Sequence, residues 1–355
     1  MSKRLEKLRS ALEKQDVDAI FVESEANRRY LSGFSGTAGA LFITKTEAYL
    51  VTDFRYVEQA KKQCPSFDIV ESLSRYDSIG ELASKTGIKT VAFEKDHITY
   101  TQYEWLKNHV KAELLPVSDI VENIRLIKDE EEIRMLKKAA VIADEAFLHV
   151  TKQIKSGMTE REIRDELEFF MRKQGADGSS FDIIVASGWR SALPHGVASE
   201  KKIEKGELVT MDFGAYYQGY CSDITRTVAI GEPSPQLKEI YDIVYDAQIQ
   251  AVNTIGPNMT GKEADEIARQ VIEEKGYGSY FGHSLGHGLG MEVHERPRLS
   301  KNEKTVLQPG MVVTVEPGIY VPDVGGTRIE DDIVITENGN ERLTTSTKEL
   351  IIIEN

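Results

Sequence analysis

Cysteine is scarce in this sequence, since Cys64 and Cys221 are the only two among 355 residues. They do not form a Cys-x-x-Cys motif, and they lie far apart along the chain. The sequence therefore has neither a disulfide framework nor a thiolate zinc site. Such sparse use of cysteine is typical of a protein that works in a reducing cytoplasm.

Long hydrophobic runs and low-complexity tracts are also lacking. No apolar run approaches the ~18–20 residues that a transmembrane helix requires. Residues 1–6 begin a charged helical pattern rather than the apolar core of a signal peptide. We therefore expect a soluble, cytoplasmic protein without long disordered segments.

Basic side chains are outnumbered by acidic ones, 44 against 58, which gives a formal net charge of −14. The imbalance is uneven: residues 1–124 carry 17 basic and 19 acidic side chains, whereas residues 125–355 carry 27 and 39. An acidic surface repels nucleic acid and anionic membranes and favours cationic partners such as metal ions. We expect neither nucleic acid nor a membrane as a partner.

The hydrophobic pattern predicts two domains, residues 1–124 and residues 125–355. The first part alternates a helical apolar face near residue 8 with strand-like runs at residues 19–22, 41–44 and 49–52, which is typical of a small α/β domain. The second part begins with an apolar stripe from Ile133 to Ile154 at steps of three and four. That stripe predicts a core helix of about seven turns at 3.6 residues per turn.

The second part contains an internal repeat. A Met-Thr-x-x-Glu box at residues 158–162 returns at residues 259–263, an offset of 101 residues, and in each box Thr and Glu can cap a helix. A strand pattern at residues 209–214 returns 104 residues later at residues 313–318. The simplest architecture is a duplicated domain whose two halves face one another, with strands inside and helices outside.

Each half carries two carboxylates in a predicted hairpin. Asp212 and Asp223 are centred on the turn signal at residues 216–219, so a regular hairpin would make them cross-strand partners with Cβ atoms ~4.5–5.5 Å apart. Glu316 and Glu330 flank a Pro-Asp-Val-Gly-Gly turn in the second half. Like charges at that spacing are costly to bury without a cation. Four such carboxylates suit a pair of divalent ions roughly 3.5–4 Å apart.

Four of the seven histidines accompany these strands: His195, His283, His287 and His294. The segment 281–290 is too rich in glycine for a stable helix, which indicates close-packed backbone that presents imidazoles. One imidazole fits a metal ligand, and another fits a group that moves protons near neutral pH.

The set Asp212, Asp223, His287, Glu316 and Glu330, with the segments 285–297 and 316–320, resembles the pita-bread metallopeptidase family. Within that family the sequence is most similar to the Xaa-Pro dipeptidases (prolidases) and the aminopeptidases P. Residues 27–36 also resemble the creatinase/prolidase N-terminal domain, so the resemblance covers the whole chain.

The resemblance implies a fold and a metal site. Residues 1–124 would form a ribonuclease H-like α/β domain of the creatinase/prolidase type, and residues 125–355 an α+β pita-bread domain with an internal pseudo-twofold duplication. Asp212 would be a bidentate ligand of one ion, Asp223 and Glu330 would bridge two ions, and His287 and Glu316 would complete the set. Manganese is the expected ion, with cobalt and zinc as alternatives.

The resemblance also implies the chemistry. A water or hydroxide held between the metals would attack the scissile carbonyl of an Xaa-Pro bond, and Glu316 would accept its proton. His294 and His283 would bind the substrate and assist proton transfer, and His195 would line the same pocket. Arg328 would orient carboxylates, and Tyr320 would lie in the outer shell. The expected substrates are short Xaa-Pro peptides, and the expected assembly is a homodimer.

Three alternatives to the Xaa-Pro dipeptidase remain open. An aminopeptidase P would release the N-terminal residue of longer Xaa-Pro peptides, although a length of 355 residues favours the dipeptidase. A methionine aminopeptidase would share the five ligands but leave residues 1–124 unexplained. A metal-free creatinase-like hydrolase, or a binding scaffold without catalysis, would lack some of the ligands, and none is missing here.

Overall fold

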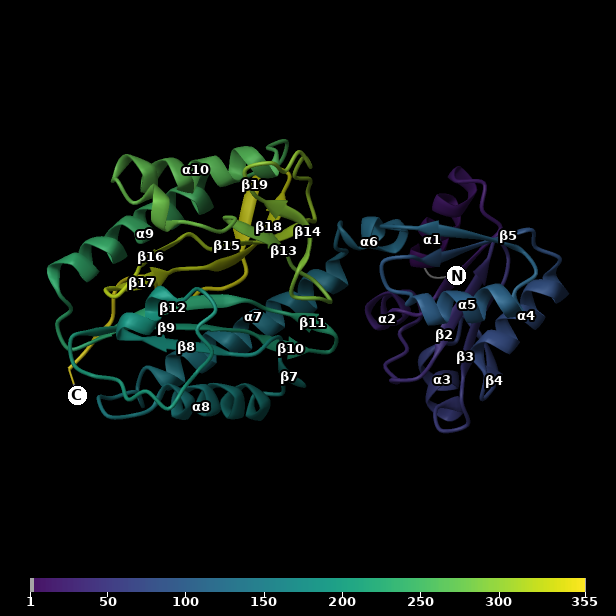
Figure 1. The fold of residues 1–355 in the computed structure, drawn as a ribbon, viewed down its shortest axis with the longest axis horizontal. Coiled ribbons are helices and arrows are strands. Elements are labelled where there is room, and N and C mark those ends of the chain that lie inside the picture. Colours follow the sequence, from purple (N-terminus) through teal and green to yellow (C-terminus); the bar gives the residue numbers. More distant parts are fainter. Residues whose placement is uncertain (1–2, 355) are drawn as a thin grey trace. The chain divides into compact units, whose positions relative to one another are not determined.

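The computed structural model describes residues 3–354. The chain divides into two compact units, the first ending at Arg125 and the second beginning at Leu126 (Figure 1). Both cysteines are buried, and neither forms a disulfide bond. Among the described residues, no helix is long and apolar enough to cross a membrane.

The first unit is built on a six-stranded mixed sheet with the order β4-β3-β2-β1-β5-β6. Its strands are β1 (Ala19–Val22), β2 (Ala40–Thr44), β3 (Ala48–Thr52), β4 (Asp68–Glu71), β5 (Thr90–Glu94) and β6 (Glu113–Val117). Its helices are α1 (Lys3–Lys14), α2 (Glu25–Ser32), α3 (Val57–Gln63), α4 (Arg75–Thr86), α5 (Tyr100–His109) and α6 (Ile120–Arg125). The strands expected at residues 19–22, 41–44 and 49–52 are confirmed, including the antiparallel hairpin of β2 and β3.

The first half of the second unit contains the helices α7 (Glu130–Val150) and α8 (Glu160–Lys173) and the short 3-10 helix η1 (Gly188–Ala192). Its strands are β7 (Gly178–Ser179), β8 (Ile184–Ser187), β9 (Glu207–Phe213), β10 (Ala215–Tyr217), β11 (Tyr220–Cys221) and β12 (Ile224–Ile230). Helix α7 has 21 residues and ends at Val150, so it is shorter than the predicted seven turns. Ile154 lies beyond the helix but is still buried in the core, and for this reason the apolar stripe overstates the helix length.

The second half contains α9 (Pro235–Thr254), α10 (Gly261–Glu274) and the 3-10 helix η2 (Gly278–Tyr280). Its strands are β13 (Gly286–Gly288), β14 (Glu295–Leu299), β15 (Val312–Val315), β16 (Gly318–Val321), β17 (Gly325–Arg328), β18 (Asp331–Thr336) and β19 (Gly339–Arg342). The C-terminal strand β20 (Ile352–Ile353) returns to the first half and pairs with β12.

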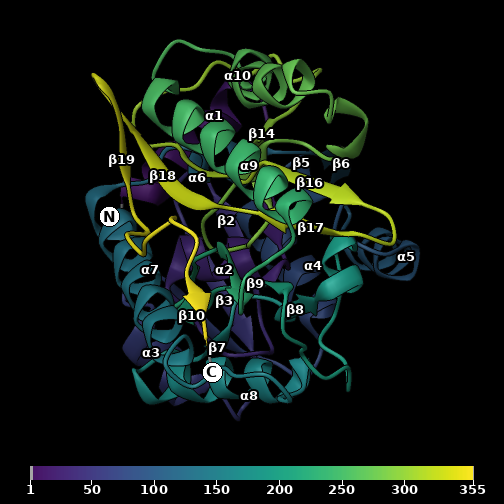
Figure 2. The ribbon, with the colours of Figure 1, turned by 90° about the vertical axis from the view of Figure 1, so that its left-hand side faces the viewer.

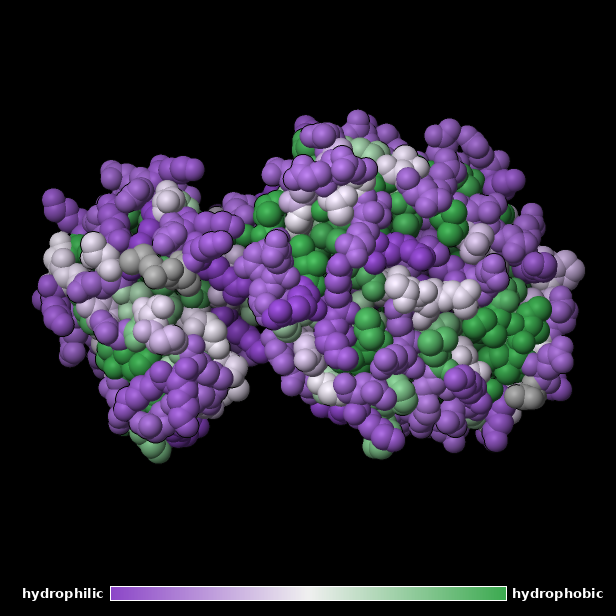
Figure 3. All heavy atoms as spheres, turned by 180° about the vertical axis from the view of Figure 1, so that it is seen from behind, coloured by the Kyte–Doolittle hydropathy of each residue, from purple (hydrophilic) through white to green (hydrophobic). Residues whose placement is uncertain are grey.

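The predicted duplication is confirmed. Both capping boxes form, at Thr159 with Glu162 and at Thr260 with Glu263. Gly206 and Gly310 precede β9 and β15 and are equivalent positions of the repeat, 104 residues apart. Both have a left-handed φ of 88°. Figure 2 shows α7 and α8 on one side of the strands and α9 and α10 on the other. Each helix pair packs against the strands of its own half and forms a separate apolar core with them. On the surface, hydrophilic residues cover most of the face seen in Figure 3.

The predicted register of the first-half hairpin is wrong. The two-residue turn is Gln218-Gly219, both with positive φ, and Tyr217 pairs with Tyr220. Paired residues are then displaced by two positions from the prediction, so Asp212 lies opposite Thr225 and not opposite Asp223. A two-residue turn with positive φ at both central positions matches the right-handed twist of the strands that it joins. The hairpin therefore closes at residues 218–219, and its centre is not the centre of the four-residue turn signal at residues 216–219. Asp223 is therefore a diagonal neighbour of Asp212.

Candidate metal centre

The acidic candidates come from strand ends in both halves. Asp212 lies on β9, and Asp223 lies between β11 and β12. Glu316 follows β15, and Glu330 precedes β18. The pairing of Val315 with Asp331 and of Gly318 with Arg328 places Glu316 and Glu330 at opposite positions on adjoining segments. The topology thus brings two acids from each half toward the middle of the unit.

A possible metal site lies where the halves meet. Ligand atoms of Asp223, His287 and Glu330 all lie within 4.8 Å of one another. His287 Nε2 is 3.3 Å from Glu316 Oε1 and 3.7 Å from Asp223 Oδ2. Four of the five predicted ligands are therefore within reach of a common centre.

Asp212 joins the cluster through an arginine. Arg328 Nη2 pairs with Asp212 Oδ2, and Arg328 Nη1 donates to the Tyr320 hydroxyl at 2.8 Å. The Tyr320 hydroxyl lies 2.9 Å from His283 Nε2. Arg328 therefore contacts a predicted ligand and links it to Tyr320 and His283. Burial raises the pKa of Tyr320 to about 12, so its hydroxyl stays protonated.

The tautomer of His287 follows from its hydrogen bond. Its Nδ1 lies 3.1 Å from the carbonyl oxygen of Gly288, and because a carbonyl only accepts, Nδ1 carries the proton. Burial, with the nearby His294, lowers the pKa of His287 to about 4. The Nε2 lone pair therefore faces the carboxylates in a neutral ring, which is the form that binds a metal.

The carboxyl groups repel one another in the absence of a cation. Burial and the charge of Glu330 raise the pKa of Asp223, and burial and the charge of Glu316 raise the pKa of Glu330. Burial raises the pKa of Glu316 to about 8. Among the described residues, Asp212 Oδ1 and Asp223 Oδ1 are buried without a hydrogen-bond partner. Oxygen atoms left in this state fit divalent cations, which accept several carboxylate ligands at once.

The remaining histidines lie around this centre. The ring of His294 packs edge-on against His287 with centroids 4.4 Å apart, and His294 is exposed. His283 donates from Nδ1 to the carbonyl of Ser284 at 2.7 Å, so its Nε2 accepts from Tyr320. His195 is exposed. Burial lowers the pKa of His283 to about 4, and partial desolvation lowers the pKa of His294. The structure thus gathers all the predicted site residues in one region.

Sequence analysis missed three residues that hold the acids. Thr225 Oγ1 donates to Glu330 Oε2 at 2.6 Å, and Thr314 Oγ1 donates to Glu316 Oε1 at 3.1 Å. Asp332 Oδ2 accepts from the backbone N–H of Asp223 at 2.9 Å. Thr225 and Thr314 each lie two residues from a predicted ligand. In an extended strand such residues share a face, and this spacing was a usable signal.

Comparisons with known proteins identify the class. Residues 134–337 match the model of metallopeptidase family M24, and residues 4–127 match the creatinase/prolidase N-terminal domain. The chain belongs to metallopeptidase family M24 and is a hydrolase that uses divalent metal ions. Its second unit has the pita-bread fold, as expected, and its first unit is the creatinase/prolidase-type domain. A ribonuclease H-like relationship of the first unit stays a prediction.

Three relatives are similar over nearly their whole length. The uncharacterised peptidase YqhT of Bacillus subtilis is 57% identical, with 99% of this chain and 100% of that protein covered. A structure of an Xaa-Pro dipeptidase from Bacillus anthracis is 56% identical, with a TM-score of 0.97 and 99% of both chains covered. A structure of an X-Pro aminopeptidase from Thermotoga maritima is 42% identical, with a TM-score of 0.92 and 98% and 99% covered.

Proposed function

We propose that this protein is an exopeptidase that hydrolyses Xaa-Pro bonds in short peptides, and that its activity is that of an Xaa-Pro dipeptidase. The observation that carries the proposal is the convergence of Asp223, His287 and Glu330 from both halves. This convergence occurs in a chain that is similar along its whole length to an Xaa-Pro dipeptidase. All five residues of the expected ligand set, Asp212, Asp223, His287, Glu316 and Glu330, are present in the sequence.

The proposed site holds two divalent ions on Asp212, Asp223, His287, Glu316 and Glu330. Carboxylate oxygens and one imidazole bind several divalent ions without selecting one strongly. Manganese is our choice by resemblance, with cobalt and zinc as alternatives. When bound, such ions supply Lewis acidity and lower the pKa of a water nucleophile.

The residues of the chain have separate proposed tasks. Glu316, whose carboxylate lies beside His287, accepts a proton from the attacking water. Partial desolvation by the surrounding protein, together with the charge of Arg298, lowers the pKa of His294. At neutral pH it is therefore a neutral ring that can bind the scissile carbonyl and pass a proton. His195 lines the same pocket. Both ring nitrogens of His283 are engaged, Nδ1 with the Ser284 carbonyl and Nε2 with the Tyr320 hydroxyl, so its proposed task is to orient Tyr320 and not to carry protons or bind substrate.

Selectivity for proline follows from the imide. A prolyl nitrogen has no N–H to pair with a strand, and its ring fixes φ, so recognition requires a shaped apolar slot beside the ions. We also propose that the protein is a homodimer that spares long peptides. Light scattering tests the assembly, and a monomer with full activity would contradict it.

An activity panel with added manganese tests the proposed substrate. We expect cleavage of Ala-Pro, with kcat/KM at least tenfold above that for Ala-Ala, a difference on the order of 1.4 kcal/mol. Equal cleavage of the two dipeptides would overturn proline specificity while leaving the metallopeptidase assignment intact.

Aminopeptidase P activity is the second candidate. The similarity to the X-Pro aminopeptidase of Thermotoga maritima favours it. The same panel therefore compares Ala-Pro with tripeptides of the form Ala-Pro-Yaa. Faster release of alanine from the tripeptides would replace the dipeptidase by the aminopeptidase.

A further inference from the structure

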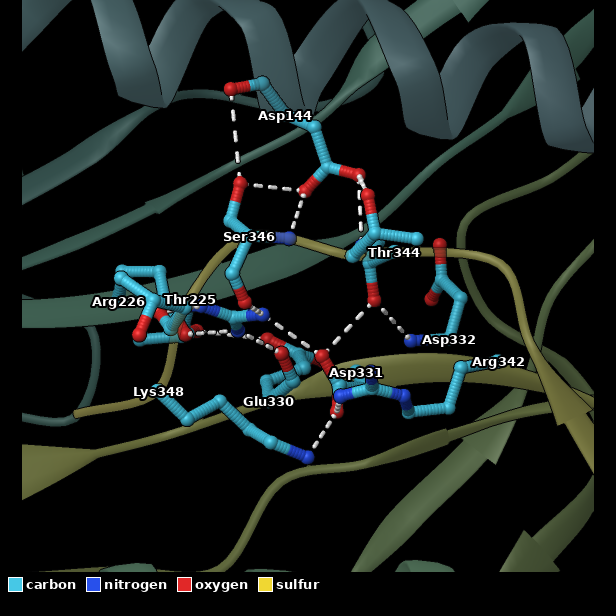
Figure 4. A network of polar contacts seen from close by, with 12 residues as sticks. Asp144, Thr225, Arg226, Glu330, Asp331, Asp332, Arg342, Thr344, Ser346 and Lys348 are labelled. Atoms are coloured by element: carbon cyan, nitrogen blue, oxygen red, sulfur yellow. Dashed lines mark hydrogen bonds and ion pairs between the residues drawn. The ribbon is translucent and has the colours of Figure 1, made fainter.

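A buried arginine joins the two halves behind the metal centre. Arg226 of β12 is 2% exposed, and its guanidinium has five N–H donors. Nε donates to Thr347 O at 3.0 Å, and Nη1 donates to Thr225 O at 3.0 Å and to Glu330 O. Nη2 donates to Asp331 Oδ1 at 2.7 Å and to Ser346 O at 2.9 Å. Each donor has an acceptor, and these acceptors come from three separate segments of the chain (Figure 4).

Asp331 is the anionic centre of this network and is fully buried. Besides Arg226, its carboxylate accepts from Lys348 Nζ at 2.6 Å and from Thr344 Oγ1 at 3.0 Å. Gln248 Nε2 of α9 donates to it at 3.0 Å. Lys348 itself is 7% exposed, so its charge is compensated inside the protein. The buried negative charge of Asp331 is thus balanced by the positive charges of Arg226 and Lys348, and both of its carboxylate oxygens accept hydrogen bonds.

The long helix α7 anchors the C-terminal part of the network. Asp144 Oδ1 accepts from the backbone N–H of Ser346 at 2.8 Å and from its hydroxyl at 2.5 Å. Asp144 Oδ2 accepts from the N–H and hydroxyl of Thr345 at 2.6 and 2.9 Å. Figure 4 shows Asp144 above Ser346 and Arg226 on the opposite side of the same segment. The segment 344–348 is therefore held on both sides.

This network lies directly behind two proposed ligands. The backbone of Glu330 donates to Thr225 O at 3.1 Å and accepts from Arg226. The neighbouring Asp332 accepts from the N–H of Asp223 at 2.9 Å. Asp223 and Glu330 belong to different halves, so no hairpin sets their separation. Only contacts across the halves, such as these, can do so.

We propose that Arg226, Asp331 and Lys348 act as positioning residues that fix Asp223 relative to Glu330 and thereby set the affinity of the site for divalent ions. The inference rests on the proposed function for the identity of the ligands. A site whose ligands are held in place before binding needs little reorganisation when the ion enters. Loss of groups that orient ligands typically lowers metal affinity or activity by roughly 10- to 100-fold.

Two loss variants and one restoring variant test this, with Mn²⁺ as the probe and a chromophoric chelator as competitor. Arg226→Lys keeps the charge but loses the five-donor fork, and Lys348→Gln removes one cation from Asp331. We expect the Kd for Mn²⁺ to rise by about 10- to 100-fold in both. Lys348→Arg keeps the charge and should restore most of the affinity. The melting temperature of each metal-free variant shows that it is folded at the assay temperature.

A matched control separates positioning from general stability. Arg28 in the first unit is also buried and donates to the carbonyls of Glu23, Gly36 and Gly39 at 3.3, 2.8 and 3.0 Å. Arg28→Lys should lower the melting temperature and leave the Kd for Mn²⁺ unchanged. An equal loss of affinity in Arg28→Lys would overturn the proposal.

The outcomes also separate this proposal from the proposed function. A wild-type Kd in the folded Arg226→Lys and Lys348→Gln variants would overturn the positioning role. If Arg226→Lys does not fold, Lys348→Gln decides alone, since Lys348 has fewer partners. Undiminished Mn²⁺ binding by Asp223→Asn would instead show that the proposed ligand set is wrong.

Discussion

The two halves of the second unit attach their histidine-bearing loops to the outer helices by different buried groups. In the first half, Glu160 of α8 accepts from the N–H and hydroxyl of Ser187 at 2.8 and 2.9 Å and from those of Ser199 at 3.0 and 2.7 Å. Arg190 completes this set as an ion pair. The carboxylate of Glu160 thus holds the loop that carries His195.

In the second half, an ion pair on α10 anchors the loop. It lies one helical turn beyond the position that is equivalent to Glu160 of α8. Arg269 pairs with Asp265 at 2.6 Å and donates to the carbonyls of Phe281 and His283 at 3.0 and 2.9 Å. Asp265 also accepts from the N–H of Leu285 at 2.9 Å. This pair holds the glycine-rich segment that carries His283 and leads into His287.

The position equivalent to Glu160 explains the difference. The offset of 101 residues places Gly261 there, and a Cβ on Gly261 would lie 2.2 Å from the carbonyl oxygen of Arg298. No side chain fits, so the anchor of the second half stands at Asp265. The duplicated frame is kept, while the group that holds each loop differs because the second half has no room for a side chain at the position of Glu160.

Ligands from the two halves should be equally indispensable, and this is the largest effect we expect. Asp223→Ala in the first half and Glu330→Ala in the second should each lose metal and abolish activity. His294→Ala should keep its metals and lose roughly 10²–10⁴-fold in rate, the usual value of positioned proton transfer. Metal content by mass spectrometry decides this. Loss of both metals in the His294 variant would make that residue a ligand.

The two anchors should differ in stability. Asp265→Ala leaves the Arg269 charge unpaired at a side-chain exposure of 7%, and breaking a buried pair costs about 3–5 kcal/mol. Glu160→Ala frees Arg190, which is 15% exposed and can reach water, but it also leaves the buried Ser187 without its acceptor, so we expect a loss of roughly 1.5–3 kcal/mol. Urea unfolding at fixed metal concentration measures both. A larger loss in Glu160→Ala would reverse the comparison.

Removal of metal should make the stability of the protein depend on pH. Burial raises the pKa of Glu316 to about 8, whereas an unfolded Glu titrates near about 4.3. Between these values the folded metal-free protein binds more protons than the unfolded chain, so its free energy of unfolding falls as pH rises. The melting temperature of chelated protein should therefore be higher at pH 6 than at pH 8. Metal-loaded protein should lack this trend, and the same trend with metal bound would contradict the explanation.

The helix caps should show the smallest effect and no difference between the halves. Thr159→Ala and Thr260→Ala each remove a capping box, and we expect each to cost about 1 kcal/mol. Urea unfolding of the two single variants under identical conditions provides the measurement. A difference beyond about 0.5 kcal/mol between them would show that the duplicated helices are not equivalent in energy.

The sequence predicted more about elements than about contacts. The strands of the first unit, both capping boxes and the repeat were readable because they depend on neighbours a few residues apart. The hairpin register was not, because Gln218 adopts a left-handed φ of 48° that its residue type does not announce. That shift of two positions moved Asp223 away from direct pairing with Asp212.

By itself, the sequence determined which residues could form the site: the acids, the histidines and the periodic glycines are all visible in its spacing. Only the tertiary structure decided how those residues are held. Arg226 contacts Glu330 and Ser346, which lie 104 and 120 residues away in sequence. Such contacts depend on how the two halves of the unit pack against each other, and the spacing of residues along the sequence carries no information about that packing.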